Sequence, residues 1–226
     1  MKIVLIGSAG KIGRHLAQEA LARGHQTLAL LRPGGSPTAS AATTRAVDVF
    51  DGAALAEAVR GQDAIVSAYG APADAPHLLP AATLAIVQAA REAGIRRVVT
   101  VGGAGGLFVR PGVRLADTEG FPPALLHKVR AHAEAVAVLA DSGLHWTCIA
   151  PAAQIVAGDR TGRYRLAVGA LVSDAAGRST ISYPDFACAL LDELEADRHL
   201  RQLVGTGDGH PIKGEHMTTP PRQGDD

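Results

Sequence analysis

The stretch MKIVLIGSAGKIGRHL, residues 1–16, joins a short apolar run to three evenly spaced glycines. The apolar residues after the glycines recur at helical spacing. Strand, glycine turn and helix in this order predict a cradle for a nucleotide phosphate, because the first amides of a helix point outward and carry partial positive charge. The predicted cradle consists of Gly7, Ser8, Ala9, Gly10, Lys11, Ile12 and Gly13.

Each glycine of this loop has its own expected role. Gly7 permits a sharp exit from the strand, Gly10 lets the backbone approach a pyrophosphate, and Gly13 lets the helix pack closely on the sheet. The spacing departs from G-x-G-x-x-G by one residue in the first interval. The alternative is a plain strand–helix turn, which needs only about one glycine.

The composition of the chain is that of a globular domain. Its 226 residues are 47% hydrophobic and 19% charged, with a formal net charge of zero, which speaks against a nucleic-acid partner. No apolar run reaches the roughly 18 residues that span a bilayer, so no membrane partner is expected. Cys148 and Cys188 lie in apolar contexts and are expected as buried, reduced thiols of a cytoplasmic protein.

Short apolar runs alternate with helical patterns along the chain. Such runs are typical of parallel strands covered on both faces, and the alternation predicts an α/β fold with a doubly wound parallel sheet. The expected strands are Lys2–Ile6, Thr27–Leu31, Arg45–Val49, Ala64–Ser67, Arg97–Val101 and His145–Ala150. The expected helices follow the glycine loop, start at Asp51, run from near Pro80 to Gly94, follow Pro122-Pro123, and run from Ser182 to about Glu195.

We expect one folded domain over residues 1–205, followed by a disordered polar tail over residues 206–226. Two connections within the domain exceed the usual length, namely residues 102–121 and residues 151–180. Both leave the C-terminal ends of expected strands, where open α/β sheets bind ligands. They are therefore expected to form the walls that face a substrate.

The end of the second expected strand indicates which dinucleotide binds. An NAD site usually places an acid there to bond the ribose hydroxyls, but this chain has Arg32 and no nearby acid. A guanidinium suits a 2′-phosphate, and Lys11 and Arg14 could join it, which favours NADP(H) over NAD(H). Asp48, with Val49 beside it, is either an adenine contact or a turn residue.

A second charged stretch, GDRTGRYR, lies in the long connection after the sixth expected strand. It brings together Asp159, Arg160, Arg163 and Arg165. This group could bind an anionic substrate or form a hydrated loop, and a hydrated loop is favoured. No His, Cys, Asp or Glu cluster has the spacing of a metal site, so no metal is expected.

Successive blocks of the sequence resemble one known group of proteins. The blocks are KIVLIGSAGKIGRHL, VDVFDGAALAEAVRGQDAIVSAYG, RRVVTVGGAGGL, HWTCIAPAA, GDRTGRYRL and ISYPDFACALLDELE. In this order they resemble the NADH-flavin reductase group of atypical short-chain dehydrogenases/reductases, which is related to biliverdin reductase B and the NmrA-like NAD(P)-binding proteins. The resemblance covers residues 1–205. It implies a Rossmann-type doubly wound parallel sheet with helices on both faces, a nicotinamide dinucleotide and a small flavin-like acceptor.

The resemblance also implies site residues at the ends of three strands. The turn of Ser67, Ala68, Tyr69 and Gly70 is expected to border the ribose and pyrophosphate of the dinucleotide. Gly102 and Gly103 are expected to line the nicotinamide side, and Pro151 and Ala152 to contact the nicotinamide. Glycine and proline also end strands for purely structural reasons.

The chain departs from the Ser and Tyr-x-x-x-Lys set of carbonyl-reducing relatives. The fifth strand ends in Gly102-Gly103 rather than Ser, and Ala124 stands four residues before Lys128 where the Tyr is expected. The weak catalytic candidates left on that helix are His127, Lys128 and His132.

This departure argues against ordinary ketone reduction, which needs a proton donor. It is compatible with a flavin as substrate or a quinone-like acceptor, where proximity of two rings is enough. The favoured function is an NADPH-dependent reductase, acting on a small molecule as a monomer or homodimer. The alternatives are a non-enzymatic NADP sensor and a tailoring ketoreductase or isomerase that uses a histidine.

Overall fold

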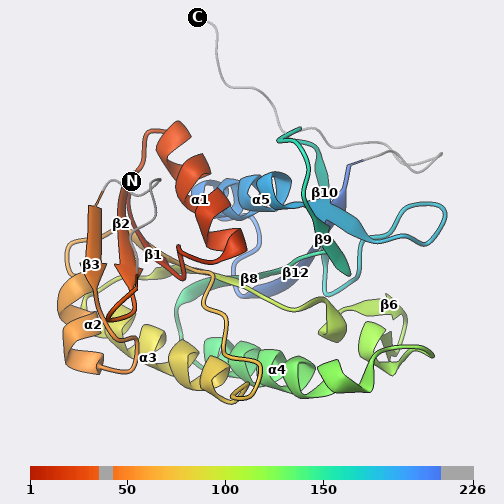
Figure 1. The fold of residues 1–226 in the computed structure, drawn as a ribbon, viewed down its shortest axis with the longest axis horizontal. Helices are drawn as coiled ribbons and strands as arrows, with labels where there is room; N and C mark the ends of the chain where they lie inside the picture. The colour runs from red at the N-terminus through yellow and green to blue at the C-terminus, as the bar shows by residue number, and fades with distance from the viewer. Residues whose placement is uncertain (36–42, 210–226) are drawn as a thin grey trace, which may run out of the picture.

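The computed structural model describes residues 1–35 and 43–209, and its centre is an eight-stranded sheet (Figure 1). In spatial order the strands are β10 (Tyr164–Val168), β12 (Gln202–Asp208), β8 (His145–Ala150), β5 (Arg97–Val101), β4 (Ala64–Ser67), β1 (Lys2–Ile6), β2 (Gln26–Leu31) and β3 (Thr43–Ala46). All neighbours pair in parallel except β10 and β12. The expected doubly wound parallel sheet is confirmed.

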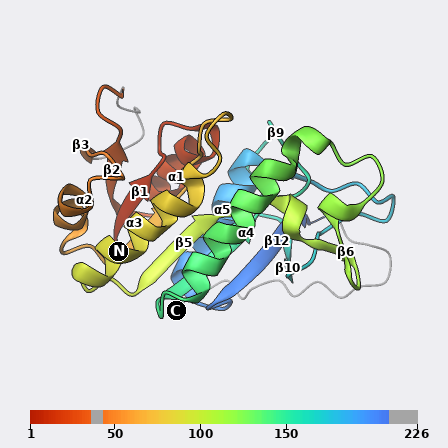
Figure 2. The ribbon, with the colours of Figure 1, turned by 90° about the horizontal axis from the view of Figure 1, so that it is seen from below.

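Helices cover both faces of the sheet (Figures 1 and 2). Helices α1 (Lys11–Ala22) and α5 (Tyr183–Ala196) form one layer, and α2 (Gly52–Val59), α3 (Leu78–Glu92) and α4 (Leu126–Ala140) form the other. One apolar core lies between the sheet and each layer, which is why both faces of the central strands are buried.

Polar side chains fix where two of these helices begin. The Asp51 carboxylate accepts a hydrogen bond from the Ala54 amide at 3.0 Å, which caps α2 as the sequence indicates. The Ser182 hydroxyl accepts one from the Asp185 amide at 3.1 Å and caps α5. The Asp185 carboxylate does not complete a capping box, because it accepts the amides of Thr161 and Gly162 instead.

The expected end of the domain at residue 205 is too early, because β12 continues to Asp208. Its sequence QLVGTGD contains two glycines and falls partly in the expected tail, yet it forms the second strand from one edge of the sheet, between β10 and β8. A Cβ atom on Gly205 would lie 2.1 Å from the Ala170 carbonyl oxygen, so the glycine marks the close approach of another backbone. Residues 210–226 of the expected tail lie outside the described residues.

The third expected strand is shifted as well. Strand β3 ends at Ala46 rather than Val49, because Asp48 closes a turn: its carboxylate accepts the Phe50 amide at 3.0 Å and its carbonyl accepts the Asp51 amide.

The two long connections contain regular elements that the sequence did not predict. Strands β6 (Phe108–Arg110) and β7 (Val113–Arg114) lie in the first, β9 (Gln154–Val156) in the second, and β11 (Thr180–Ser182) at its end. Short 3₁₀ turns cover Ala104–Gly106, Leu115–Asp117 and Pro123–Leu125. The connections meet where the Phe108 amide donates to Gly169 and its carbonyl accepts the Leu171 amide, both at 2.9 Å.

Candidate functional site

The glycine loop lies between β1 and α1 and is held by backbone contacts. Gly7 has a φ of +79°, and a Cβ atom there would lie 2.4 Å from the Ala68 carbonyl oxygen. A Cβ atom on Gly13 would lie 2.0 Å from the Gly7 carbonyl oxygen. At Gly10 the nearest atom would be that same oxygen at 3.3 Å, with nothing else within 4 Å. Gly7 and Gly13 are therefore required by the fold, whereas Gly10 leaves the outer side of the loop open.

The N-terminus of α1 is left without a side-chain cap. The first intrahelical bond runs from the Arg14 amide to the Gly10 carbonyl, so the amides of Lys11, Ile12 and Gly13 have no acceptor within the helix. Beside them the buried Ser8 hydroxyl finds no hydrogen-bond partner among the described residues. This cluster of unsatisfied donors suits a phosphate.

Basic side chains surround this end of the sheet. Lys11 and Arg14 are exposed on the first turn of α1, and Arg32 is exposed directly after β2. The register that pairs Ile6 with Leu30 brings the ends of β1 and β2 together, so all three cations lie around one edge.

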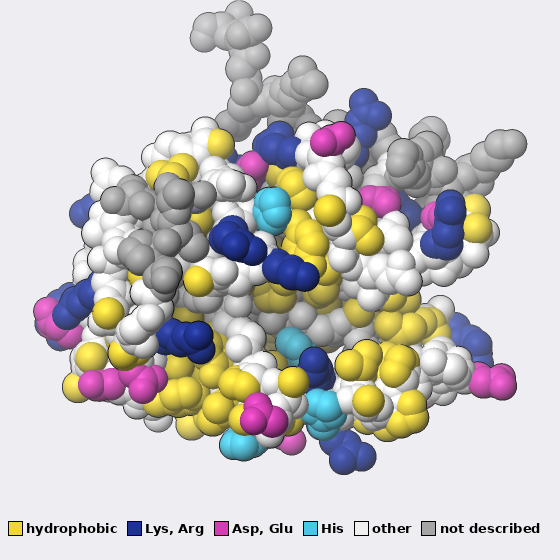
Figure 3. All heavy atoms as spheres, in the orientation of Figure 1, with side chains coloured by type: hydrophobic (Ala, Val, Ile, Leu, Met, Phe, Trp, Pro, Cys, Tyr) yellow, Lys and Arg dark blue, Asp and Glu magenta, His cyan; other side chains and the backbone are white. Residues whose placement is uncertain are grey.

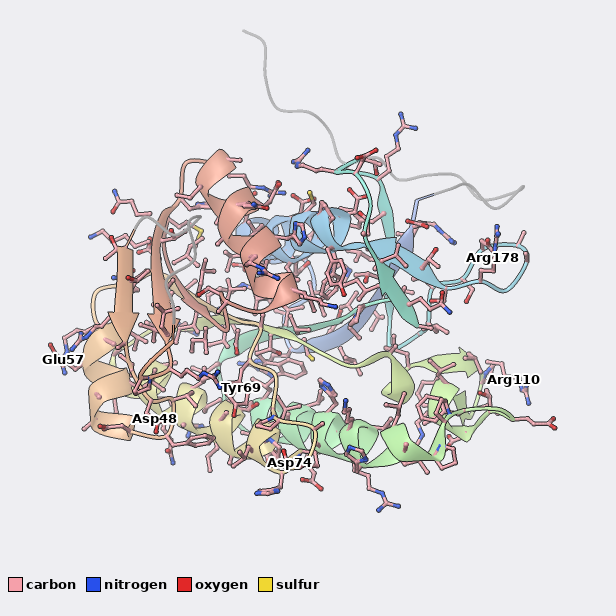
Figure 4. All side chains as sticks on the ribbon, in the orientation of Figure 1. Asp48, Glu57, Tyr69, Asp74, Arg110 and Arg178 are labelled. Atoms are coloured by element: carbon pink, nitrogen blue, oxygen red, sulfur yellow. The ribbon has the colours of Figure 1, made fainter. Side chains whose placement is uncertain are left out.

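The expected adenine contacts lie at the next corner, where Asp48 and Tyr69 are neighbours (Figure 4). Burial raises the pKa of the Tyr69 phenol, and the Asp48 carboxylate raises it further. The Phe50 ring meets Tyr69 edge to face, with ring centroids 6.3 Å apart. Asp48 uses one carboxylate oxygen for its own turn, which is the alternative role considered from the sequence, and Val49 is half-buried.

The other expected contacts follow β4, β5 and β8. Ser67 is buried and its hydroxyl accepts the Tyr69 amide at 3.3 Å, while Ala68 packs its backbone against Gly7. Pro151 is half-buried at the end of β8. Ala152 points into the core between the sheet and the α1–α5 layer, so its side chain is a packing residue.

Glycines at the end of β5 allow two side chains to approach the sheet. A Cβ atom on Gly102 would lie 2.8 Å from Cys148 Sγ, and one on Gly103 would lie 2.7 Å from the His132 ring. Complete burial raises the pKa of Cys148 to about 11, so this thiol is protonated and unreactive at neutral pH.

Of the three catalytic candidates on α4, His132 is the one that reaches the strand ends. Burial lowers the pKa of His132, and the charge of Lys128 lowers it further, so its imidazole is neutral at neutral pH. Lys128 is exposed one turn earlier. His127 is exposed, and Ala124, where the relatives have Tyr, is also exposed.

A small cavity of about 20 Å³ lies behind Gly102 and Gly103, between β4, β5, α3 and α4. His132 lines it together with Ser67, Tyr69, Thr83, Thr100 and Cys148, among others. Thr83 and Thr100 are not among the residues expected from the sequence, and alternation along β5 is the one signal that points Thr100 to this side. The cavity is too small for a substrate.

The GDRTGRYR stretch is tied to the helices rather than free. Arg160 makes two hydrogen bonds of 2.7 Å to the buried Glu19 carboxylate of α1. The Asp185 carboxylate accepts the amides of Thr161 and Gly162 at 2.8 Å. Arg160 is thus paired with Glu19 rather than free for an anion, and residues 158–163 form an exposed, hydrated loop that is held to α1 and α5.

These elements enclose a hollow between the α1–α5 layer and the α3–α4 layer (Figure 3). Lys, Arg and His side chains gather around its centre and left, whereas hydrophobic side chains gather on its right, over β6 and the start of α4. A family model described as NAD(P)H-binding matches residues 7–197 of the chain.

The chain belongs to this NAD(P)H-binding family.

Curated and solved members are similar over most of their length. The curated protein YwnB of Bacillus subtilis (strain 168) is 37% identical over 203 residues, which are 88% of this chain and 94% of YwnB. A structure named "putative exported protein" from Burkholderia pseudomallei is 44% identical with a TM-score of 0.84, covering 92% of this chain and 99% of that one.

A structure named "a putative NADH-flavin reductase" from Streptococcus pneumoniae TIGR4 is 31% identical with a TM-score of 0.83, over the same shares of the two chains. A "putative epimerase" from Bacteroides thetaiotaomicron is 34% identical with a TM-score of 0.82, covering 93% of this chain and 98% of that one. These neighbours agree with the resemblance to the atypical short-chain dehydrogenase/reductase group.

The residues of this NAD(P)H-binding chain fit a dinucleotide. The open side of Gly10, the free first-turn amides and the unpartnered Ser8 hydroxyl together provide donors for a pyrophosphate. Across the part of the chain that the structure describes, no helix is long and apolar enough to cross a membrane.

Proposed function

We propose that the chain is an NADPH-dependent oxidoreductase that transfers hydride to a flavin-like or quinone-like small molecule. One observation carries the proposal: the uncapped start of α1, which suits the pyrophosphate, lies on the same sheet edge as the His132–Gly103 contact. A dinucleotide extended along this edge has its nicotinamide beside Gly102, Gly103 and Pro151.

The choice of NADPH over NADH rests on Arg32, with Lys11 and Arg14 nearby. All three are exposed, and no ion pair of theirs is present within residues 1–35 and 43–209. A free guanidinium can form two parallel hydrogen bonds with a 2′-phosphate, which a 2′-hydroxyl cannot match.

The bound nicotinamide supplies a hydride, and the residues around it bind and orient the rings. Gly102 and Gly103 make room for Cys148 and His132, which brings the His132 ring to the strand ends. Neutral His132 can hold a hydrogen bond at that position but is not a strong acid. Such an arrangement suits acceptors that spread the incoming charge over a ring and take their proton from water.

The test measures NADPH oxidation by the purified protein in the presence of FMN, riboflavin or a quinone. The rate is the decrease in the absorbance of the reduced nicotinamide. The proposal predicts turnover that saturates with NADPH and that needs about thirtyfold more NADPH in Gly10→Ala. Absence of turnover with every acceptor in the panel, together with measurable NADPH binding, would instead support a non-enzymatic dinucleotide sensor. Exposed Ala124 in place of the usual Tyr is the observation that favours this second candidate.

A tailoring ketoreductase or isomerase is the third candidate, favoured by the contact of His132 with Gly103. It predicts that His132→Ala abolishes activity on a carbonyl substrate while His127→Ala, at an exposed position, has no effect. A cytoplasmic location and a monomeric or homodimeric state stay predictions.

A further inference from the structure

We infer that the acceptor site recognises a neutral, planar, apolar ring and holds no subsite for a phosphate or carboxylate. This inference rests on the proposed reductase function and narrows its substrate class: lumiflavin or a simple quinone is as good a substrate as FMN. It follows from two observations. The arginines of the two long connections mostly pair with other protein groups, and the large side chains exposed over β6 and the start of α4 are apolar.

Three of the four arginines of the second connection are occupied by the protein itself. Arg160 is bound by the Glu19 carboxylate, and its hydrogen bonds, with those of Arg23, hold the pKa of Glu19 down to about 2 against the opposing effect of burial. Arg165 donates to the carbonyl oxygens of Asp208 and Ser173 at 2.9 and 2.8 Å. Arg178 pairs with Asp174 at 2.8 Å.

The first connection offers an anion no better partner. Arg114 forms an ion pair of 2.9 Å with Asp117. Arg110 lies at the end of β6, and Arg178 lies on a loop of the second connection. Figure 4 shows both far from Tyr69. Arg163 is the remaining arginine of the second connection, and Lys128 and Arg130 lie nearby on α4. All three are exposed to water, where an ion pair contributes little.

Apolar side chains take the place of charges at this end of the hollow. The backbone at Gly105 packs against Val129 and Phe121, so the start of the first connection lies directly on α4. Phe108 on β6, and Leu125 and Leu126 at the start of α4, are 45%, 39% and 37% exposed, which is high for large apolar residues. Figure 3 shows hydrophobic side chains gathered over these elements.

Burial of a flat ring against this surface is favourable in proportion to its apolar area, whereas a phosphate placed there loses hydration without gaining a partner. The phosphate of FMN therefore stays in water and adds no more than an exposed ion pair. We expect kcat/KM for FMN and for lumiflavin to agree within about fivefold.

The experiment compares kcat/KM for lumiflavin, riboflavin, FMN and menadione at saturating NADPH. Similar values for the three flavins and turnover of menadione support the inference, and a preference for FMN above about twentyfold overturns it. The Kd of each compound for the NADP⁺-saturated protein is measured as well and is compared in the same way. This comparison tests the inference even if hydride transfer is not observed. Failure of the proposed function is then seen separately, as ring binding without turnover.

The position of the site is tested with Leu126→Asp, a substitution that a helix N-terminus tolerates. It is expected to weaken lumiflavin binding and lower kcat/KM about tenfold while the Kd of NADPH is unchanged. The matched control is Leu84→Asp, since Leu84 is 47% exposed on α3 away from the two connections. Equal effects of the two variants, or no effect of Leu126→Asp, would contradict the assignment.

Discussion

The α1 end and the α4 end of the ligand-binding sheet edge are closed in different ways. Beside α1, backbone atoms within one short loop contact one another, as Gly13 contacts Gly7. Beside α4, the contacts join segments that are far apart in the chain, such as Phe108 with Gly169 and His132 with Gly103. The α1 end is therefore specified by a short motif and suits a ligand that all such proteins share. The residues that line the α4 end can change without a change in that motif.

Among the substitutions at the α1 end, Gly13→Ala is expected to have the largest effect on stability. Its Cβ atom would lie 2.0 Å from the Gly7 carbonyl oxygen, so the loop must move, and we expect a loss of more than about 3 kcal/mol in the free energy of unfolding. Denaturant titration measures this loss. The control is Gly70→Ala, where a Cβ atom meets nothing within 4 Å, and a similar loss in both variants would contradict the account.

Gly10→Ala separates binding from folding on the same loop. Its Cβ atom would meet only the Gly7 carbonyl oxygen at 3.3 Å, so we expect the fold to stay within about 1 kcal/mol of the wild type. The methyl group occupies the open side of the loop, and the Kd of NADPH is expected to rise about thirtyfold, or about 2 kcal/mol. Calorimetry measures this change, and unaltered affinity would show that the dinucleotide binds elsewhere.

Arg160→Gln tests how the acceptor side is tied to α1. It leaves the buried Glu19 carboxylate with Arg23 as its remaining partner, and we expect a loss of about 1–2 kcal/mol at pH 7. In the wild type the pKa of Glu19 is lowered from 4.5 to about 2, so its contribution is complete above pH 4.5 and is lost as the pH falls towards 2.

The difference between wild type and Arg160→Gln should therefore shrink over that acidic range. Denaturant unfolding at several pH values gives the curve. A difference that is independent of pH would mean that Arg160 acts by packing alone.

The smallest expected effect concerns the 2′-phosphate. Arg32→Gln should raise the Kd of NADPH about tenfold and that of NADH less than about twofold, because the guanidinium has a partner only in NADPH. Fluorescence titration with both coenzymes measures the ratio. If both affinities fall equally, Arg32 is not the residue that distinguishes them.

The sequence predicted the features that depend on neighbouring residues. Strand, glycine loop and helix follow one another within 1–16, and the cap at Asp51 bonds a residue three positions on, so both were predicted correctly. Strand β12 was missed because its last residues, from 206 on, resemble the polar, glycine-rich tail that follows them. Gly205 and Gly207 are there because residues 170–172 pack over the strand.

The acceptor side could not be predicted in the same way. The partner of Arg160 is Glu19, and no local pattern connects a loop after β8 to the middle of α1. Helical spacing placed Lys128 and His132 on one side of α4, but the contact between His132 and Gly103 depends on how the helix packs on β5. Long-range packing decides these positions.

The central claim is that the α1 end binds the dinucleotide and the α4 end binds the acceptor. Its most direct test is an NMR map of the amide chemical shifts of the isotopically labelled protein. NADP⁺ alone is expected to shift Gly10, Gly13 and Gly103, and lumiflavin added afterwards is expected to shift Phe108 and Leu126 while the first set keeps its positions. The account would be contradicted if lumiflavin displaced NADP⁺, or if both ligands shifted the amide signals of the same residues.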